Sequence, residues 1–200
     1  MHPWPDTVTL SGPHATLRPL AAADHDGLVA AARDGDLWQL WYTAVPSPEG
    51  MAAEIQRRLD LRARGSMLPF TVLDAGAGGG RISGMTTYMN IDAVNRRVEI
   101  GSTWYAAGTQ RTALNTQCKR LLLGHAFESL DCLAVEFRTH RLNTQSRRAI
   151  ERLGAQLDGV LRAHMRLPNG TVRDTAVYSI TAAEWPTVRA HLDWQLARPR

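Results

Sequence analysis

Glu99 is the one charged residue in the run from Val98 to Tyr105, and it is the first candidate for acid–base chemistry. The run is rich in β-branched and aromatic residues, which is typical of a strand. A carboxylate in an apolar strand is desolvated, so its pKa rises and the group becomes a useful proton acceptor. The alternative is a structural Glu that faces solvent or forms an ion pair with Arg81 or Arg97.

A polar segment, residues 106–117, follows this strand and leads into a predicted helix over residues 118–128. Apolar residues recur there at helical spacing, whereas Lys119 and Arg120 fall outside the apolar stripe. The start of such a helix presents unpaired N–H groups and the positive end of the helix dipole, which suit a phosphate group. Because most strand–loop–helix junctions bind nothing, the residues alone leave both interpretations open.

The composition predicts one globular domain that spans residues 1–200, with 44% hydrophobic and 21% charged residues. The formal net charge of +4 comes from 23 basic and 19 acidic residues, and Lys119 is the single lysine. The arginines are scattered and form no basic stripe with interleaved aromatic residues, so we expect no nucleic-acid partner. The basic balance favours an anionic ligand such as a phosphorylated cofactor.

Cys118 and Cys132 are the only cysteines, and no pattern of metal ligands surrounds them. We expect both to be small buried residues in a reducing compartment, and we predict no metal site. The N-terminal segment lacks a basic region followed by an apolar run, and no window reaches the length of a membrane span. These features predict a cytoplasmic protein without a membrane partner.

The order of predicted elements is β α α β β β α β α β β α, which indicates an α/β (α+β) fold. Its central sheet would be mixed and mostly antiparallel, with about seven strands and helices on both faces. Asp24 is expected to cap the first helix, and the Gly-rich residues 75–80 are expected to form a hairpin turn. Trp38, Trp41 and Tyr42 form an aromatic cluster that is either core or a pocket wall.

This order, with particular residues at particular places, resembles the GNAT superfamily of N-acetyltransferases. The resemblance runs from about Ala15 to about Leu192 and is closest to the branch of the ribosomal-protein N-terminal-alanine acetyltransferases. The segments that carry it are residues 99–101, 104–105, 119–128, 143–146, 150–155, 159–162, 165–170, 173–174 and 177–180. It implies a GNAT-like fold and an enzyme that uses acetyl-CoA as cosubstrate.

In that superfamily, the loop before the central helix has the pattern Gln/Arg-x-x-Gly-x-Gly/Ala, and its backbone amides bind the CoA pyrophosphate. The matching positions begin at Gln110, and Ala113 and Asn115 occupy the two glycine positions. Ala adds one methyl group and Asn tolerates left-handed φ, so a phosphate cradle is still feasible. The resemblance therefore assigns the following residues to the cofactor: Gln110, Arg111, Thr112, Ala113, Leu114, Asn115 and Thr116.

The resemblance also implies roles near the reacting atoms. Asn143 would cap the next helix and contact the CoA arm, and Ser146 would donate a proton to the departing thiolate; the plain alternatives are a helix cap and a serine bonded to backbone. A backbone N–H at the end of the strand would polarise the thioester carbonyl, which brings Trp104 and Tyr105 into the cofactor site. His140 is expected to be a surface or loop residue.

The leading hypothesis is an acetyl-CoA-dependent N-acetyltransferase that acts on a primary amine, possibly a protein N-terminus. Two alternatives keep the fold: the acceptor is a small-molecule amine, or the domain is a non-catalytic CoA sensor or assembly partner. Exposed late strands make a homodimer plausible.

Overall fold

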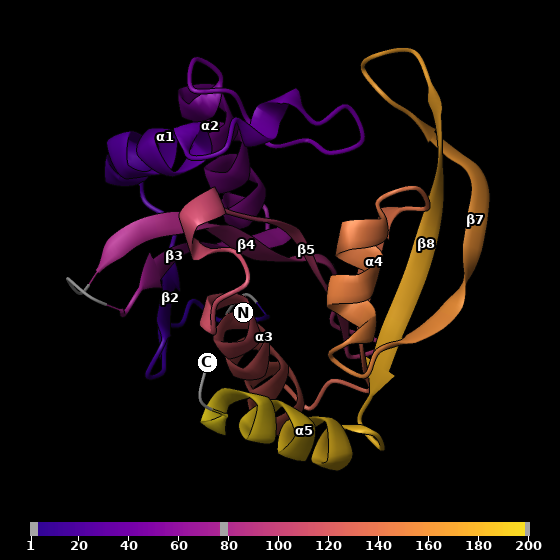
Figure 1. Ribbon diagram of the computed structural model, residues 1–200. Helices are drawn as coiled ribbons and strands as arrows, with labels where there is room; N and C mark the ends of the chain where they lie inside the picture. The colour runs from indigo at the N-terminus through magenta and orange to yellow at the C-terminus, as the bar shows by residue number, and fades with distance from the viewer. Residues whose placement is uncertain (1–3, 77–79, 199–200) are drawn as a thin grey trace.

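The computed structural model describes residues 4–76 and 80–198, and its centre is a mixed, mostly antiparallel sheet (Figure 1). Its strands stand in the order β1-β2-β3-β4-β5-β6-β8-β7, and only β5 and β6 are parallel neighbours. The bounds are β1 Leu10–Ser11, β2 Ala15–Pro19, β3 Met67–Asp74, β4 Arg81–Asp92, β5 Arg97–Tyr105, β6 Ala134–His140, β7 Gln156–Arg166 and β8 Val172–Thr181. The predicted fold class is confirmed; the strand beyond the expected seven is β1, which has two residues.

Helices cover both faces of the sheet, as predicted. α1 and α2 pack on β4 and β3 on one face, and α3 lies on the opposite face together with α4 and α5 (Figure 1). We call these the α2 face and the α3 face. The helices are α1 His25–Arg33, α2 Met51–Ala63, α3 Leu114–Gly124, α4 Thr144–Glu151 and α5 Trp185–Ala197, with single turns at Ala22–Asp24, Leu37–Gln39, Ala107–Thr109 and His125–Ser129.

The parallel strands β5 and β6 pair over a short stretch and then separate. Arg97, Val98 and Glu99 face Ala134, Val135 and Glu136 in register, but β5 continues to Tyr105 and β6 to His140 without further pairing to each other. We call the point of separation, after Glu99 and Glu136, the fork. It leaves backbone groups of both strands free for another partner.

A β-bulge in β5 lies just beyond the fork. Gly101 pairs with Thr87 and Trp104 with Met85, so Ser102 and Thr103 together oppose the single residue Thr86. Ser102 has φ of 48°, in the left-handed region that a serine seldom adopts. The extra residue reverses the alternation of side chains, so that Trp104 joins the core under α1 and α2 while Tyr105 joins the core under α3.

Three local predictions need correction or lie outside the structure. Asp24 precedes α1 but does not cap it, because its carboxylate accepts hydrogen bonds from Arg18 and Thr71 and from its own preceding turn. The central helix begins at Leu114 and not at residue 118, since Leu114 is buried in the core and its N–H bonds to the Thr112 hydroxyl. The pairing of β3 with β4 is antiparallel, as a hairpin requires, but residues 77–79 of its Gly-rich turn lie outside the described residues.

Candidate active site

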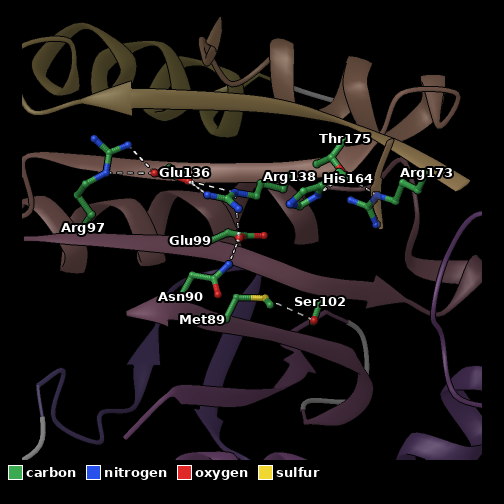
Figure 2. Close-up of polar contacts among 10 residues, drawn as sticks. All are labelled: Met89, Asn90, Arg97, Glu99, Ser102, Glu136, Arg138, His164, Arg173 and Thr175. Atoms are coloured by element: carbon green, nitrogen blue, oxygen red, sulfur yellow. Dashed lines mark hydrogen bonds and ion pairs between the residues drawn. The ribbon is translucent and has the colours of Figure 1, made fainter. Parts of the chain in front are cut away.

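Glu99 lies at the fork on the α2 face, and only 5% of its surface is exposed. Asn90 Nδ2 donates to Glu99 Oε2 over 2.6 Å, and Arg138 Nε lies 3.6 Å from the same oxygen (Figure 2). A Cβ atom on Gly101 would lie 2.8 Å from Glu99 Oε1, so glycine at this position leaves room for the carboxylate. The carboxylate is therefore fixed in direction by three neighbours.

Burial is the largest influence on Glu99 and raises the pKa of its carboxyl group. The Asn90 hydrogen bond and the charges of Arg138 and Arg173 act in the opposite direction, and Glu136 adds to the rise. The net direction is upward, as predicted from the apolar strand. The predicted ion-pair partners are wrong, because Arg97 Nε bonds to Glu136 over 3.1 Å and Arg138 takes the place beside Glu99.

Glu99 belongs to a row of polar side chains that we call the polar strip (Figure 2). Its members come from β4, β5, β6, β7 and β8: Asn90, Arg97, Glu99, Glu136, Arg138, His164, Arg173 and Thr175. Glu136 accepts hydrogen bonds from Arg97 and, over 2.9 Å, from Arg138. At the other end Thr175 Oγ1 contacts Arg173 Nε at 2.9 Å and His164 Nδ1 at 3.0 Å. These bonds fix the position of the side chains in each of two groups, one around Glu99 and Glu136 and the other around Thr175.

Arg58 of α2 fixes the bulge, and the sequence reasoning missed it. The side chain is 1% exposed, and its Nε donates to Glu54 over 2.7 Å while Nη1 donates to Thr87 over 2.8 Å. The guanidinium also reaches the carbonyl oxygen of Ser102 at 3.4 Å. The available signal was its place in the stripe of Met51 and Ile55, seven residues after the first, with a carboxylate four residues earlier.

The loop before α3 positions the predicted phosphate-binding residues differently from the expected glycine cradle. Ala113 is the residue before α3 with φ of −69°, and Asn115 lies in the first helical turn. The left-handed residue of this segment is Arg111, with φ of 62°. Neither glycine position of the pattern thus needs glycine for its backbone conformation here.

Among the other residues assigned to the loop, Gln110 and Thr112 have hydrogen bonds that shape it. Gln110 Nε2 donates to the Tyr105 carbonyl over 3.1 Å, and the Thr112 hydroxyl donates to the Thr109 carbonyl over 2.7 Å. Thr116 is fully buried, and its hydroxyl accepts from Arg152 Nη1 over 3.0 Å. These contacts gather two threonine hydroxyls and Arg152, the residue directly after α4, around the start of α3.

Trp104 and Tyr105 direct their side chains into the protein. Trp104 packs with the residues under α1 and α2, and Tyr105 is buried beside Cys118 of α3. Neither Trp104 Nε1 nor Tyr105 Oη has a hydrogen-bond partner within the described ranges 4–76 and 80–198. If these two residues contact a cofactor, they therefore do so through their backbone atoms in the separated part of β5.

Asn143 and Ser146 lie where β6 passes into α4. Asn143 Oδ1 accepts from the Ser146 N–H over 3.0 Å, which confirms the predicted helix cap. Ser146 is half-buried in the first turn of α4. Within the described chain no hydrogen bond joins it to Glu99, which lies on β5, the other strand at the fork.

His140 is buried at the end of β6, so its interpretation as a surface residue is wrong. Its Nδ1 accepts from the Leu142 N–H over 3.0 Å, and burial and Arg173 lower the pKa of the imidazole. The ring of Trp41 lies edge-on to it, with 5.4 Å between centroids, while half of the Trp41 surface stays exposed. Trp41 thus packs against the end of β6 with part of its ring exposed, and its role as a pocket wall stays a prediction.

Comparison with known proteins adds the decisive observation to this geometry. The model of the acetyltransferase (GNAT) domain matches residues 14–156, well over half of the chain. The chain belongs to the GNAT acetyltransferase family. The predicted resemblance is therefore confirmed.

Individual relatives support the same assignment. A Bacillus subtilis protein named "Putative ribosomal N-acetyltransferase YdaF" is 34% identical over 106 residues, which are 53% of this chain and 57% of YdaF. The chain thus spans little more than half the length of this relative. The crystal structure of a GCN5-related N-acetyltransferase from Brucella melitensis is 30% identical, covers 98% of this chain and 88% of its own, and has a TM-score of 0.84. Mycobacterium smegmatis RimJ, in complex with CoA-disulfide, is 23% identical with a TM-score of 0.78 over 98% and 97% of the two chains, which shows the shared fold.

The GNAT cosubstrate, acetyl-CoA, fits the residues present at the fork. Asn115 Oδ1 is buried and has no hydrogen-bond partner among the described residues. Lys119, one turn later on α3, is 6% exposed, so its placement outside the apolar stripe was wrong. A ligand that carries phosphates and amide groups would supply partners to both residues.

Three further observations on the described part of the chain concern metal groups, membrane helices and cysteines. Its His, Cys, Asp and Glu residues form no group of three or more that could hold a metal ion. Its helices include none that is both long and apolar enough to cross a membrane. Cys118 and Cys132 are buried free thiols, as expected.

Proposed function

We propose that this GNAT protein transfers an acetyl group from acetyl-CoA to a primary amine, with a protein N-terminus as the first acceptor to test. The observation that carries the proposal is the buried Glu99 carboxylate at the fork, held by Asn90 and Arg138 with its pKa raised. An amine must lose a proton to become acylated, and a carboxyl group with a raised pKa is suited to accept it. The polar strip leads from this carboxylate toward β7 and β8 on the α2 face.

Acetyl-CoA supplies a thioester whose carbonyl carbon forms the new C–N bond as the C–S bond breaks. Glu99 accepts the amine proton, directly or through one water. The bulge at Ser102, braced by Arg58, holds the separated part of β5 so that a backbone N–H can polarise the carbonyl. Ser146 donates its hydroxyl proton to the departing thiolate and regains a proton from solvent, to which Glu99 releases the amine proton.

The start of α3 binds the phosphates of the cofactor in this proposal. The N-terminal turn, Leu114–Thr116, contributes N–H groups and the positive end of the helix dipole. Arg111 and Thr112 lie in the preceding loop and contribute a charge and a hydroxyl group. Gln110 and Ala113 shape this loop, Asn143 contacts the CoA arm from α4, and the backbone of Trp104 and Tyr105 lines β5.

We infer further that the protein is cytoplasmic and forms a homodimer through β7. This edge strand is exposed along nearly its whole length and presents Leu157, Leu161 and Met165. A long edge strand with apolar side chains is protected when it pairs with another strand. Sedimentation of the wild type beside Leu161→Arg tests this inference: a dimer that the substitution splits supports it, and a monomeric wild type contradicts it.

The function is tested by calorimetric titration with CoA followed by an acetylation assay. The assay uses acetyl-CoA with short peptides that have free N-termini, with the same peptides blocked at the N-terminus as controls, and with simple amines. We expect micromolar CoA binding and acetylation of the free peptides. Transfer to simple amines alone would assign a small-molecule acceptor, and an absence of CoA binding would leave a non-catalytic domain.

Ser146→Ala separates a proton donor from a structural serine. We expect turnover to fall by about tenfold or more while CoA affinity stays the same, because the group acts in the transition state. Unchanged turnover would contradict the donor role. Thr144→Ala, in the same turn of α4, is the matched control.

A further inference from the structure

Helix α3 directs two polar side chains toward the fork, and neither has a full set of partners. Asn115 Oδ1 is a buried acceptor without a donor among residues 4–76 and 80–198. Lys119 Nζ makes one hydrogen bond, of 3.2 Å to Thr103 Oγ1, although an ammonium group has three N–H donors. The Asn115 oxygen therefore lacks a donor, and the Lys119 ammonium group has N–H donors that are not used in this hydrogen bond.

The two residues lie on one side of the helix. They are four positions apart, which places them about one turn from each other on the same face. Neighbouring contacts define where this face points: Cys118 lies beside Tyr105 of β5, and Lys119 Nζ lies 5.9 Å from the ring centroid of Phe137 of β6. The face between them therefore looks at the space where β5 and β6 have separated.

The environment of Lys119 is unusual for a lysine. It forms no ion pair with any carboxylate of the described chain. Its side chain contacts a threonine hydroxyl and an aromatic ring, and Arg152 adds a second positive charge nearby. Burial lowers the pKa of its ammonium group from 10.5 to about 8. Lysine is seldom buried without a partner because desolvation of the charge destabilises the folded state.

We propose that Asn115 and Lys119 bind the pantetheine arm of CoA through its amide groups. The proposal rests on the function proposed above, since it concerns the cosubstrate of that reaction. The arm contains two secondary amides, and each has one N–H donor and one C=O acceptor. Asn115 Oδ1 accepts from an amide N–H, and the free N–H groups of Lys119 donate to an amide carbonyl.

Position along the helix favours the arm over the phosphates for Lys119. At a rise of about 1.5 Å per residue, Lys119 lies about 7 Å beyond the first residue of α3. Phosphate groups bind at the first turn, where the N–H groups are free. Lys119 is too far along the helix to serve that turn and lies instead beside the inner part of the fork, toward Thr103.

The proposal assigns a binding role to Asn115, the residue at which this chain departs from the family pattern. The second glycine position of the GNAT loop holds Asn115 here, in helical conformation. If Asn115 contacts the arm, replacing it with the glycine of the pattern removes a contact and weakens CoA binding. A mere obstruction by the side chain predicts the opposite, since glycine would then improve binding.

The single lysine of the chain makes a direct test feasible. Protein labelled with ¹⁵N-lysine has one side-chain ammonium signal, that of Lys119. We expect this signal to shift on addition of CoA and to stay in place with adenosine 3′,5′-bisphosphate, which lacks the arm. A signal that ignores CoA, or that moves equally with both ligands, overturns the proposal.

Titration calorimetry of variants gives the energetic test with the same two ligands. We expect Lys119→Met and Asn115→Gly to weaken CoA binding about tenfold each, and to change nucleotide binding less than about twofold. Arg120→Met is the matched control, because the next residue of α3 pairs with Asp193 of α5 and faces away from the fork. Circular dichroism verifies that each variant is folded.

The outcomes separate this proposal from the proposed function. A wild type that fails to bind CoA overturns both. A wild type that binds CoA, with variants that bind it equally well or that lose both ligands in parallel, overturns the arm contact and leaves the acetyltransferase proposal intact. Improved CoA binding by Asn115→Gly overturns it as well.

Discussion

On the α2 face of the fork, Glu99 is surrounded by groups that satisfy one another, whereas on the α3 face Lys119 and Asn115 keep unused bonding capacity. The Glu99 carboxylate accepts a hydrogen bond from Asn90 and pairs with Arg138, and Glu136 accepts hydrogen bonds from Arg97 and Arg138. Among the described residues, Lys119 donates one hydrogen bond, to the Thr103 hydroxyl group, and Asn115 Oδ1 has no partner. A satisfied network holds a reactive group in place, while an unsatisfied one is stabilised by a ligand. The difference points to chemistry on one face and cosubstrate binding on the other.

Glu99→Gln is the strongest way to break this comparison. We expect turnover to fall by about 10²- to 10⁴-fold, because the amide cannot accept the proton, while CoA affinity is unchanged. Since the ionised carboxylate is the active form, the wild type should lose activity as pH falls through its raised pKa, and the variant should lack this acid limb.

A pH–rate profile of both proteins measures the effect. Glu136→Gln, on the neighbouring strand, serves as the comparison: its plateau turnover should stay within a few-fold of the wild type, and its acid limb should remain but move to lower pH, because Glu136 adds to the rise in the Glu99 pKa. Near-normal turnover of Glu99→Gln would assign the proton transfer to another group.

Lys119→Met tests whether the buried ammonium group on the α3 face destabilises the folded protein in the absence of cofactor. The folded-state pKa of about 8 lies below the ordinary 10.5, so below pH 8 both states hold the proton and the burial penalty is complete. Between pH 8 and 10.5 the unfolded chain binds more protons, and the free energy of unfolding should rise by up to about 3 kcal/mol. The variant should lack this rise.

Denaturant unfolding without cofactor, at several pH values between 7 and 10.5, measures the difference between wild type and variant. Taking the difference removes the titration of the other residues. Parallel curves over this range would mean that Lys119 is hydrated in the folded protein.

Asn143→Ala, at the start of α4, tests whether this residue contacts the cofactor in addition to capping the helix. Loss of the cap to the Ser146 N–H should cost about 1 kcal/mol of stability. Asn143→Ser retains a capping group, so a variant that keeps stability but binds CoA more weakly would separate the cofactor contact from the cap. Equal CoA affinity in all three proteins would reduce Asn143 to a cap.

Asn90→Ala produces the smallest expected change. The Asn90 N–H stabilises the Glu99 carboxylate and lowers its pKa, so its removal should raise that pKa further. The acid limb of the rate profile should then move to higher pH, with little change at the plateau. A limb that stays in place or moves to lower pH would contradict Glu99 as the group that sets it.

Much of the fold could be predicted because local patterns and tertiary structure agree. Asn143 is a strong capping residue at the start of an amphipathic segment, and it caps α4. The apolar run around Glu99 formed a buried strand, and that burial is the largest cause of the rise in the pKa of its carboxyl group.

The errors arose where a distant partner decides the environment. Lys119 and Arg120 are adjacent basic residues that the sequence does not distinguish, yet Lys119 is buried against β5 and β6 and Arg120 pairs with Asp193 of α5. Arg58 was not distinguished from the other scattered arginines, although its place in an apolar stripe was visible. The ion-pair partner of Glu99 could not be chosen between arginines, because the register that brings Arg138 beside it depends on the parallel pairing of β5 and β6.

The burial of the single lysine has a consequence for the durability of the protein. Acetyl-CoA reacts slowly and without catalysis with exposed amines, and an enzyme that works beside this thioester is constantly subject to modification. The chain uses arginine for its other basic positions and hides Lys119, so its surface offers no lysine amine to such damage. Lys119, at the fork, is the one side-chain amine of the sequence that this thioester can meet, and the proposed contact keeps it beside the amide groups of the arm.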